Sequence, residues 1–234
     1  MKRVVVYLGL TICLVVKSLA VNVEFRIANY KDNKKCAISY TFDDGMLEHY
    51  TQVFQQMEKY GFKGTFFVCG KNIRTKTLPD EKTFMSWEQL KEMSDRGHEI
   101  SNHTWSHANL VNLSWEDAMK EIAMNDSVIE TMTGKKPMTL CYPWNAFNEI
   151  LQQWVMEKKV AARIYQYALC GGNARSTVES LTNWVNELMV SGDWGVTMTH
   201  GITMGLIIFL TLRYYGVILI GLRSMNPMCG LLLL

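Results

Sequence analysis

The segment that decides the fold is residues 36–42, CAISYTF, which runs directly into Asp43-Asp44-Gly45. The run is apolar and rich in strand-forming residues, so it predicts a buried strand. The strand is expected to end at two adjacent carboxylates and a turn-forming glycine. In β/α barrels the loops that follow the strands converge on the barrel axis and carry the chemistry.

Helical and strand-like patterns alternate along the rest of the chain. Helices are expected where start and stop signals bracket helical spacing, at residues 48–60, 86–96, 114–133, 152–159 and 182–189. Further strands are expected at residues 65–68, 98–102, 138–141, 160–165 and 195–199. This alternation predicts a parallel sheet. Because so many units fall in one domain, we expect an α/β fold, an incomplete or distorted (β/α) barrel with parallel strands.

The composition describes an ordinary globular protein. Of the 234 residues, 48% are hydrophobic and 20% are charged, which suits one domain with a sizeable core. The formal net charge is +2 and no basic stripe is present, so we expect no nucleic-acid partner. No feature predicts an obligate protein partner. The six cysteines form no CxxC pair and several lie in apolar runs, which favours buried free thiols.

Residues 1–20 have the pattern of a signal peptide. A basic start precedes an apolar run at residues 4–16, and small residues ending at Ala20 mark a cleavage site. The run is shorter than a membrane span requires. The alternative is a buried N-terminal strand. We expect an exported protein, whether secreted, periplasmic or held at the cell surface, with its catalytic domain at residues 21–205.

Polar residues follow the expected strands at the point where each strand ends. In chain order they are Asp43-Asp44, His103 with His107, Tyr142-Pro143-Trp144 and His200. Since the carboxyl ends of parallel strands meet at one end of a barrel, we expect these residues to lie close together. That end of the barrel is the expected active site.

Three of these residues form a candidate metal site. His103 and His107 occur as His-Thr-Trp-Ser-His, a spacing at which both imidazoles can converge on one cation. Adjacent carboxylates repel each other, and a cation bound to Asp44 would stabilise that pair and leave Asp43 free as a base. Two histidines and one aspartate form a facial ligand set with room for water and substrate. Each half of the pattern alone also occurs without a metal, on helix surfaces and in ordinary turns.

The order of these groups resembles one known family. T-F-D-D-G at residues 41–45 and N-H-T-W-S-H at residues 102–107 are similar to the first two motifs of the polysaccharide deacetylase family, also called NodB homology or carbohydrate esterase family 4. Y-P-W at residues 142–144 resembles the third motif and M-T-H at residues 198–200 the last one. The resemblance covers residues 35–205 and implies an incomplete (β/α) barrel.

The resemblance also implies an activity and a cofactor. The expected enzyme removes acetyl groups, N-acetyl groups in first place, from an acetylated polysaccharide or oligosaccharide. By matching position, Asp44, His103 and His107 would bind one divalent metal, which is usually zinc in this family. Two alternatives stay open: an O-acetyl esterase on the same fold, and a catalytically impaired homologue that binds sugar.

Matching positions imply the catalytic roles as well. Asp43 would take a proton from water, and His200 would protonate the leaving amine as general acid. The oxyanion would lie against the metal and the backbone N–H of Tyr142. Pro143 and Trp144 complete this substrate side of the site.

Two departures from the family pattern concern the base and the general acid. Cys141 stands where the third motif usually opens with an arginine that tethers the base. A neutral thiol cannot pair with Asp43, so either the base is held in another way or the activity differs. The family also has an upstream Asp-containing motif that orients the final histidine. Asp193 lies too close in sequence to His200 to be assigned to it.

The chain changes character after Gly205. Residues 206–222 are almost wholly apolar, with Arg213 near the middle. A membrane anchor, a buried strand pair and a shifted reading frame are the three interpretations, and a central arginine disfavours the first. We expect residues 206–234 to be an aberrant tail that follows from a frameshift.

Overall fold

The computed structural model describes residues 30, 34, 36–77, 83–168, 178–201 and 229–231, and the structural statements below concern these residues. The strands are β1 (Cys36–Asp43), β2 (Thr65–Val68), β3 (Glu99–Asn102), β4 (Thr139–Cys141), β5 (Ala161–Arg163), β6 (Tyr167–Ala168), β7 (Trp194–Thr199) and β8 (Cys229–Leu231). The α-helices are α2 (Gln55–Tyr60), α3 (Trp87–Asp95), α4 (Trp115–Thr133), α5 (Glu149–Lys158) and α6 (Val178–Ser191). Three short turns are the π-helix η2 (His49–Phe54) and the 3-10 helices η3 (Leu110–Asn112) and η4 (Pro143–Asn145).

The strands form one parallel sheet that curls into a half-barrel. They lie in the order β5-β4-β3-β2-β1-β7-β6, and β8 pairs with β1. Every strand pairing is parallel. Among the described residues no pairing joins β5 to β6, so the barrel is open between these two edge strands. The prediction of an incomplete (β/α) barrel with parallel strands is confirmed.

The central strand β1 is the one expected from residues 36–42. All of its side chains are buried. It pairs with β2 over Thr41–Asp43 and with β7 over Ala37–Phe42. A strand covered on both faces reads as a nearly continuous apolar run, which is why the sequence identified it. The last residue of this buried strand is a carboxylate, Asp43.

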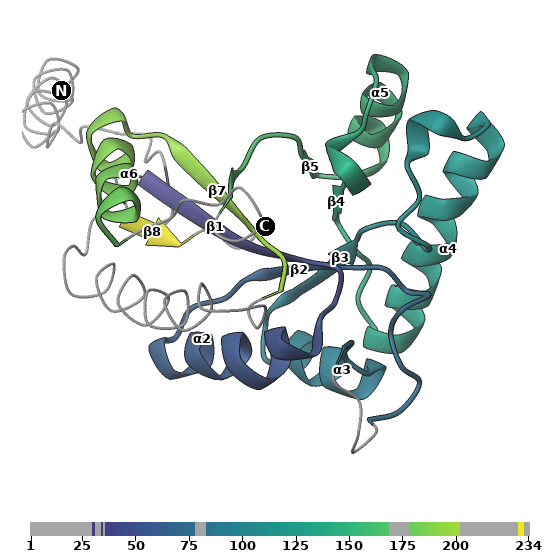
Figure 1. Cartoon of the computed structure of the whole chain (residues 1–234), viewed down its shortest axis with the longest axis horizontal. Helices are drawn as coiled ribbons and strands as arrows, with labels where there is room; N and C mark the ends of the chain where they lie inside the picture. The colour runs from purple at the N-terminus through teal and green to yellow at the C-terminus, as the bar shows by residue number, and fades with distance from the viewer. Residues whose placement is uncertain are drawn as a thin grey trace, which may run out of the picture.

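Helices cover the outer face of the curled sheet. α3 and α4 contact β3, α5 contacts β5, and α6 contacts β1 (Figure 1). Buried apolar side chains fill the space between the helices and the sheet, among them Phe42, Met57, Phe66, Leu90 and Ile129. The rings of Phe42 and Phe66 stack with centroids 4.8 Å apart.

Local signals fixed several helix ends as expected. The backbone N–H of Ser86 donates to Oε1 of Gln89 at 2.8 Å, and the N–H of Gln89 donates back to Oγ of Ser86 at 3.2 Å. This reciprocal pair is the predicted capping box. The helix expected at residues 114–133 is α4, which begins after the N-cap Ser114 and ends before Gly134, at φ 75°.

Other boundaries differ from the expected ones. The helix expected at residues 48–60 is split, because η2 is π-helical before α2 begins. The wider turn places His49 and Phe54 on one buried face. The helix expected at 182–189 is longer: α6 spans Val178–Ser191, and Gly192, with a φ of 77°, follows its last residue. The strands expected at 138–141 and 160–165 are shorter, and the two-residue β6 was not expected.

The cysteines divide into two kinds. Cys69 and Cys141 are buried free thiols, as predicted. Cys36 is disulfide-bonded, so the prediction of free thiols is wrong there. The spacing of cysteines along a sequence does not show which of them meet in a fold, and export would permit such a bond.

The two ends of the chain lie mostly outside the described residues. Residues 1–20 are outside them, so the signal peptide stays a prediction. Of the tail at 206–234, only residues 229–231 are described; they form β8 beside the first residues of β1. The frameshift origin of the tail stays a prediction too. Within the described part, none of the helices has the length and apolar character needed to cross a membrane.

Candidate active site

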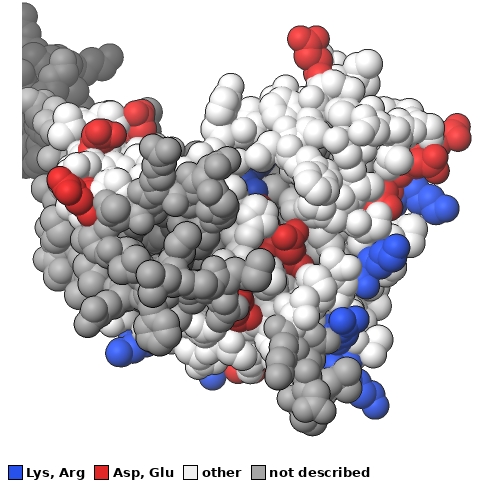
Figure 2. All heavy atoms as spheres, in the orientation of Figure 1, with Lys and Arg blue, Asp and Glu red and all other residues white. Residues whose placement is uncertain are grey.

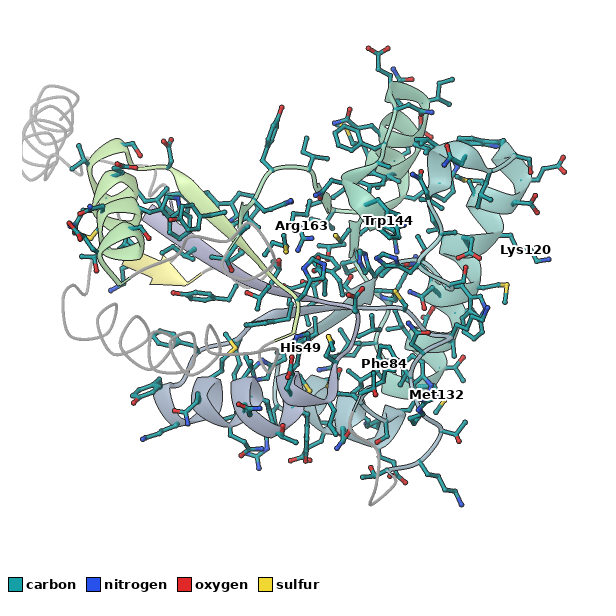
Figure 3. The ribbon with its side chains drawn as sticks, in the orientation of Figure 1. His49, Phe84, Lys120, Met132, Trp144 and Arg163 are labelled. Atoms are coloured by element: carbon teal, nitrogen blue, oxygen red, sulfur yellow. The ribbon has the colours of Figure 1, made fainter. Side chains whose placement is uncertain are left out.

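The sequence-predicted site residues come together at the carboxyl ends of the strands. Asp43 ends β1, His103 follows β3, Tyr142 follows β4 and His200 follows β7. Acidic atoms lie in the middle of this face of the molecule (Figure 2). Figure 3 shows His49, Trp144 and Arg163 around the same end of the sheet, although they come from different elements.

Asp44 lies between the two predicted histidine ligands. Its Oδ1 atom is 3.5 Å from Nε2 of His103 and 3.5 Å from Nε2 of His107. Zinc bound at about 2.1 Å with tetrahedral angles places ligand atoms roughly 3.4 Å apart. The two measured separations therefore fit a shared metal ion. Asp44 and His107 both have positive φ, 74° and 60°, so the backbone is strained where these ligands are presented.

Contacts behind the histidines fix their orientation. Nδ1 of His103 lies 2.9 Å from the carbonyl oxygen of Cys141, so that nitrogen carries the proton and Nε2 is left with a lone pair facing Asp44. The turn that carries His107 is held by Glu121, whose carboxylate accepts from both the N–H and the hydroxyl of Ser106 at 2.8 Å. Both predicted ligands are thus held by the surrounding protein.

Two buried thiols lie beside these ligands. Asp44, Cys69 and His103 form one group with potential ligand atoms within 4.8 Å of one another, and Asp43, His103 and Cys141 form another. Burial, with the nearby carboxylates, raises the pKa of both thiols. The thiolate is the form that binds metals. Asp44, His103 and His107 remain the predicted ligand set, and the two thiols lie within reach of it.

Asp43 is held by an arginine that the sequence did not indicate. Nη1 of Arg163 donates to Oδ1 of Asp43 at 2.8 Å, and Nη2 donates to Oδ2 at 2.5 Å. The two residues are 8% and 2% exposed, so the pair is shielded from solvent. Burial alone would raise the pKa of Asp43, but the guanidinium of Arg163 outweighs it and holds that pKa below its usual value.

The imidazole of His200 reaches toward both carboxylates. Its Nε2 atom lies 3.9 Å from Oδ2 of Asp43 and 3.9 Å from Oδ2 of Asp44. Its side chain is 43% exposed, so it faces the solvent side of the site. His49 lies beneath it and is completely buried. The sequence gave no signal for His49, which appeared only as one residue of an expected helix.

The third predicted segment forms η4 at the edge of the site. Tyr142 and Pro143 are buried, whereas Trp144 is 70% exposed. Trp144 has a φ of 62°, and its Nε1–H donates to the carbonyl oxygen of His107 at 3.3 Å. Its ring centroid lies 5.2 Å from that of His107. A solvent-facing indole is thus fixed beside a predicted metal ligand.

Known proteins with similar sequences belong to one family. Residues 30–162 match the family model described as polysaccharide deacetylase. The peptidoglycan-N-acetylmuramic acid deacetylase PdaC of Bacillus subtilis is 34% identical over 122 residues, which cover 52% of this chain and 24% of that protein. The peptidoglycan-N-acetylglucosamine deacetylase of Bacillus cereus is 26% identical over a match covering 70% of this chain and 67% of that protein.

Solved structures share the fold. The peptidoglycan N-acetylglucosamine deacetylase Bc1960 is similar with a TM-score of 0.64 at 21% identity, over 86% of this chain and 87% of its own. The family 4 carbohydrate esterase of Streptomyces lividans, in complex with acetate, has a TM-score of 0.64 at 17% identity, over 83% and 91%. At these identities the likeness extends to the fold alone.

Proposed function

Because this chain belongs to the polysaccharide deacetylase family, we propose that it is a metal-dependent hydrolase that removes acetyl groups, N-acetyl groups in first place, from a glycan. The observation that carries the proposal is the unequal surroundings of Asp43 and Asp44. Asp43 is buried against Arg163, whereas Asp44 lies between two imidazole nitrogens. Two adjacent carboxylates in different environments suit different roles, one as base and one as ligand.

The proposed cofactor is one divalent metal, zinc in first place, held by Asp44, His103 and His107. When bound, it would supply Lewis acidity toward an acetyl carbonyl and toward water. The 3.5 Å separations of the ligand atoms support this assignment. The remaining steps belong to the side chains of the chain itself.

Asp43 is proposed as the general base. Its carboxylate stays ionised beside Arg163 and can accept a proton from the attacking water. His200 is proposed as the general acid, since its exposed imidazole can give a proton to the leaving amine nitrogen. The backbone N–H of Tyr142 is proposed as a donor to the oxyanion. The fixed indole of Trp144 offers an apolar face on which a sugar ring can stack.

The substrate class proposed is an N-acetylated glycan outside the cytoplasm. Related proteins are named as deacetylases of peptidoglycan and of chitin. Those names, together with the expected signal peptide at residues 1–20, favour a cell-wall or extracellular polysaccharide. An inert sugar-binding role is less favoured, because Arg163 supplies the base with the cation that Cys141 cannot provide.

Acetate release from defined substrates tests the proposal. The purified protein is incubated with N-acetylglucosamine oligomers and, in parallel, with O-acetylated xylan, before and after chelation and zinc addition. We expect acetate from the oligomers, loss with chelation and recovery with zinc. Release from the xylan alone would mean an esterase. Release unaffected by complete metal removal, or no release from any acetylated glycan, would contradict the proposal.

A further inference from the structure

We propose that Arg163 of β5 is the positioning residue of Asp43 and replaces the arginine that the family's third motif supplies from β4. The inference rests on the proposed function for its catalytic meaning. Its structural part does not depend on that function: the arginine that binds Asp43 comes from β5 instead of the neighbouring strand β4. Cys141 and Arg163 are the two halves of this exchange.

The strand register makes such an exchange possible. Cys141 of β4 and Arg163 of β5 are Cα partners in neighbouring parallel strands. Partnered residues of adjacent parallel strands lie about 4.8 Å apart and point to the same face. Their side chains therefore enter the barrel side by side. Sγ of Cys141 lies 2.8 Å from Nη2 of Arg163 and 3.9 Å from Oδ2 of Asp43, so the small thiol leaves the guanidinium a path to the carboxylate.

The guanidinium is committed to this one carboxylate. Both Nη atoms bond the two oxygens of Asp43 in the paired geometry that fixes a carboxylate in one orientation. Nη1 also donates to Oγ1 of Thr41 at 2.5 Å, and the Phe67 ring centroid lies 5.4 Å from the guanidinium carbon. Its Nε is buried without a hydrogen-bond partner in the described part of the chain. The guanidinium thus keeps both hydrogen bonds to Asp43, although its Nε–H makes none there.

Because Arg163 and Asp43 are buried, each charge needs the other as its counterion. The side chains of Arg163 and Asp43 are 4% and 2% exposed. An uncompensated charge at such a place is strongly unfavourable, so removal of either partner leaves the other without its counterion. Both oxygens of this carboxylate already accept from one guanidinium, so a second guanidinium would compete for the same acceptors. An arginine at position 141 should therefore substitute for Arg163 but should conflict with it when both are present.

Moving the arginine from position 163 to position 141 tests this inference. The variants are Arg163→Ala, Cys141→Arg and the double variant that carries both, with Arg96→Ala as the matched control because Arg96 is 62% exposed. We expect Arg163→Ala to lower kcat for acetate release at least 100-fold with KM and bound zinc near those of the unchanged protein. The double variant should regain at least tenfold in kcat over Arg163→Ala. Cys141→Arg alone should be less active than the double variant, and Arg96→Ala should be unaffected.

A second measurement separates this inference from the proposed enzyme activity. Unfolding midpoints in denaturant are compared for Asp43→Asn, Arg163→Ala and the combination of the two. A coupled pair predicts that the combination loses no more than the more damaging single change. In the same assay, the double variant that carries Cys141→Arg and Arg163→Ala should unfold at a higher denaturant concentration than Arg163→Ala alone. This comparison holds even if the single variant folds poorly. If the unchanged protein released no acetate, the proposed function would fail while this coupling could still be found. Additive losses, or a relocated arginine that regains neither midpoint nor kcat, would overturn the inference.

Discussion

The Nε2 atom of His49 lies 3.0 Å from the backbone carbonyl oxygen of His200. Since a carbonyl oxygen only accepts, His49 carries its proton on Nε2. Burial lowers the pKa of His49 to about 4, so the ring is neutral near neutral pH and keeps this donor. Gly201 follows directly, and a Cβ there would lie 2.8 Å from a carboxylate oxygen of Glu48. Glu48 and His49, at the start of η2, thus pack against the backbone that carries the proposed general acid.

Replacing His49 with phenylalanine is expected to weaken catalysis without removing a reacting group. The carbonyl of His200 would lose its donor and the loop could shift, and a misplacement of about 1 Å can lower kcat by roughly 100-fold. His49→Gln keeps an amide N–H and should lose less. Steady-state acetate release for the three proteins gives kcat and KM. Equal kcat in the unchanged protein and His49→Phe would show that this contact does not position His200.

Separate roles for the two adjacent carboxylates predict separate losses. Asp43→Asn should keep the metal and abolish turnover, because the amide cannot accept the proton of water. His107→Ala should lose the metal, because one of three protein ligands is gone. Metal content after dialysis and acetate release are measured on both variants. Equal metal loss in the two proteins would contradict the division between base and ligand.

Glu99 gives the fold a pH-dependent stability. Its carboxylate accepts from the hydroxyls of Thr139 and Thr65 at 2.8 and 2.9 Å, and burial raises its pKa from 4.5 to about 7. The folded state therefore binds this proton more tightly than the unfolded state. The contribution of protonated Glu99 to the free energy of unfolding is fully present below pH 4.5 and is lost as pH rises toward 7. At 1.36 kcal/mol per pKa unit, the loss is roughly 3 kcal/mol.

The substitution Glu99→Gln isolates that effect. The variant cannot ionise at this position, so its advantage over the unchanged protein should be small at pH 4.5 and grow until about pH 7. Unfolding free energies of both proteins are measured across this range in one buffer series. A difference between the two proteins that stays constant with pH would show that Glu99 titrates normally in the folded state.

The sequence was informative where the determining pattern is local. Residues 36–42 form a strand whose buried run and terminal carboxylates are adjacent in the chain, and the spacing of His103 and His107 already places them on one turn. Such features need no knowledge of the distant fold. The same holds for the capping box at Ser86, where donor and acceptor are close in sequence.

Arg163 could not be found in this way. It lies on β5, and its partner Asp43 lies on β1, with β4, β3 and β2 between them in the sheet. The two meet only because the sheet curls around a common axis. An arginine in a short apolar segment does not indicate that the sheet curls in this way. His49 was missed for a related reason, since the π-helical turn that points it at His200 has no distinguishing sequence pattern.

Asn125 links the metal side of the site to the helix behind it. This side chain is fully buried on α4. Its Oδ1 accepts from the N–H of Gly70 at 2.9 Å, and its Nδ2 donates to the carbonyl oxygen of Val68 at 2.7 Å and to Oδ1 of Asn102 at 3.0 Å. It therefore joins the ends of β2 and β3, directly before His103.

Asn125→Ala should destabilise the fold and loosen the site together. Removing the amide leaves the buried backbone N–H of Gly70 without its acceptor, at a cost of about 1–3 kcal/mol. We expect a lowered unfolding free energy and weaker zinc binding, because Asn102 precedes His103 and depends on the same network. Met124→Ala is the matched control on the same helix, since Met124 is 39% exposed. Denaturant unfolding with and without zinc measures both effects. A loss of stability no larger than that of Met124→Ala, or one with unchanged zinc affinity, would show that Asn125 does not support the ligand His103.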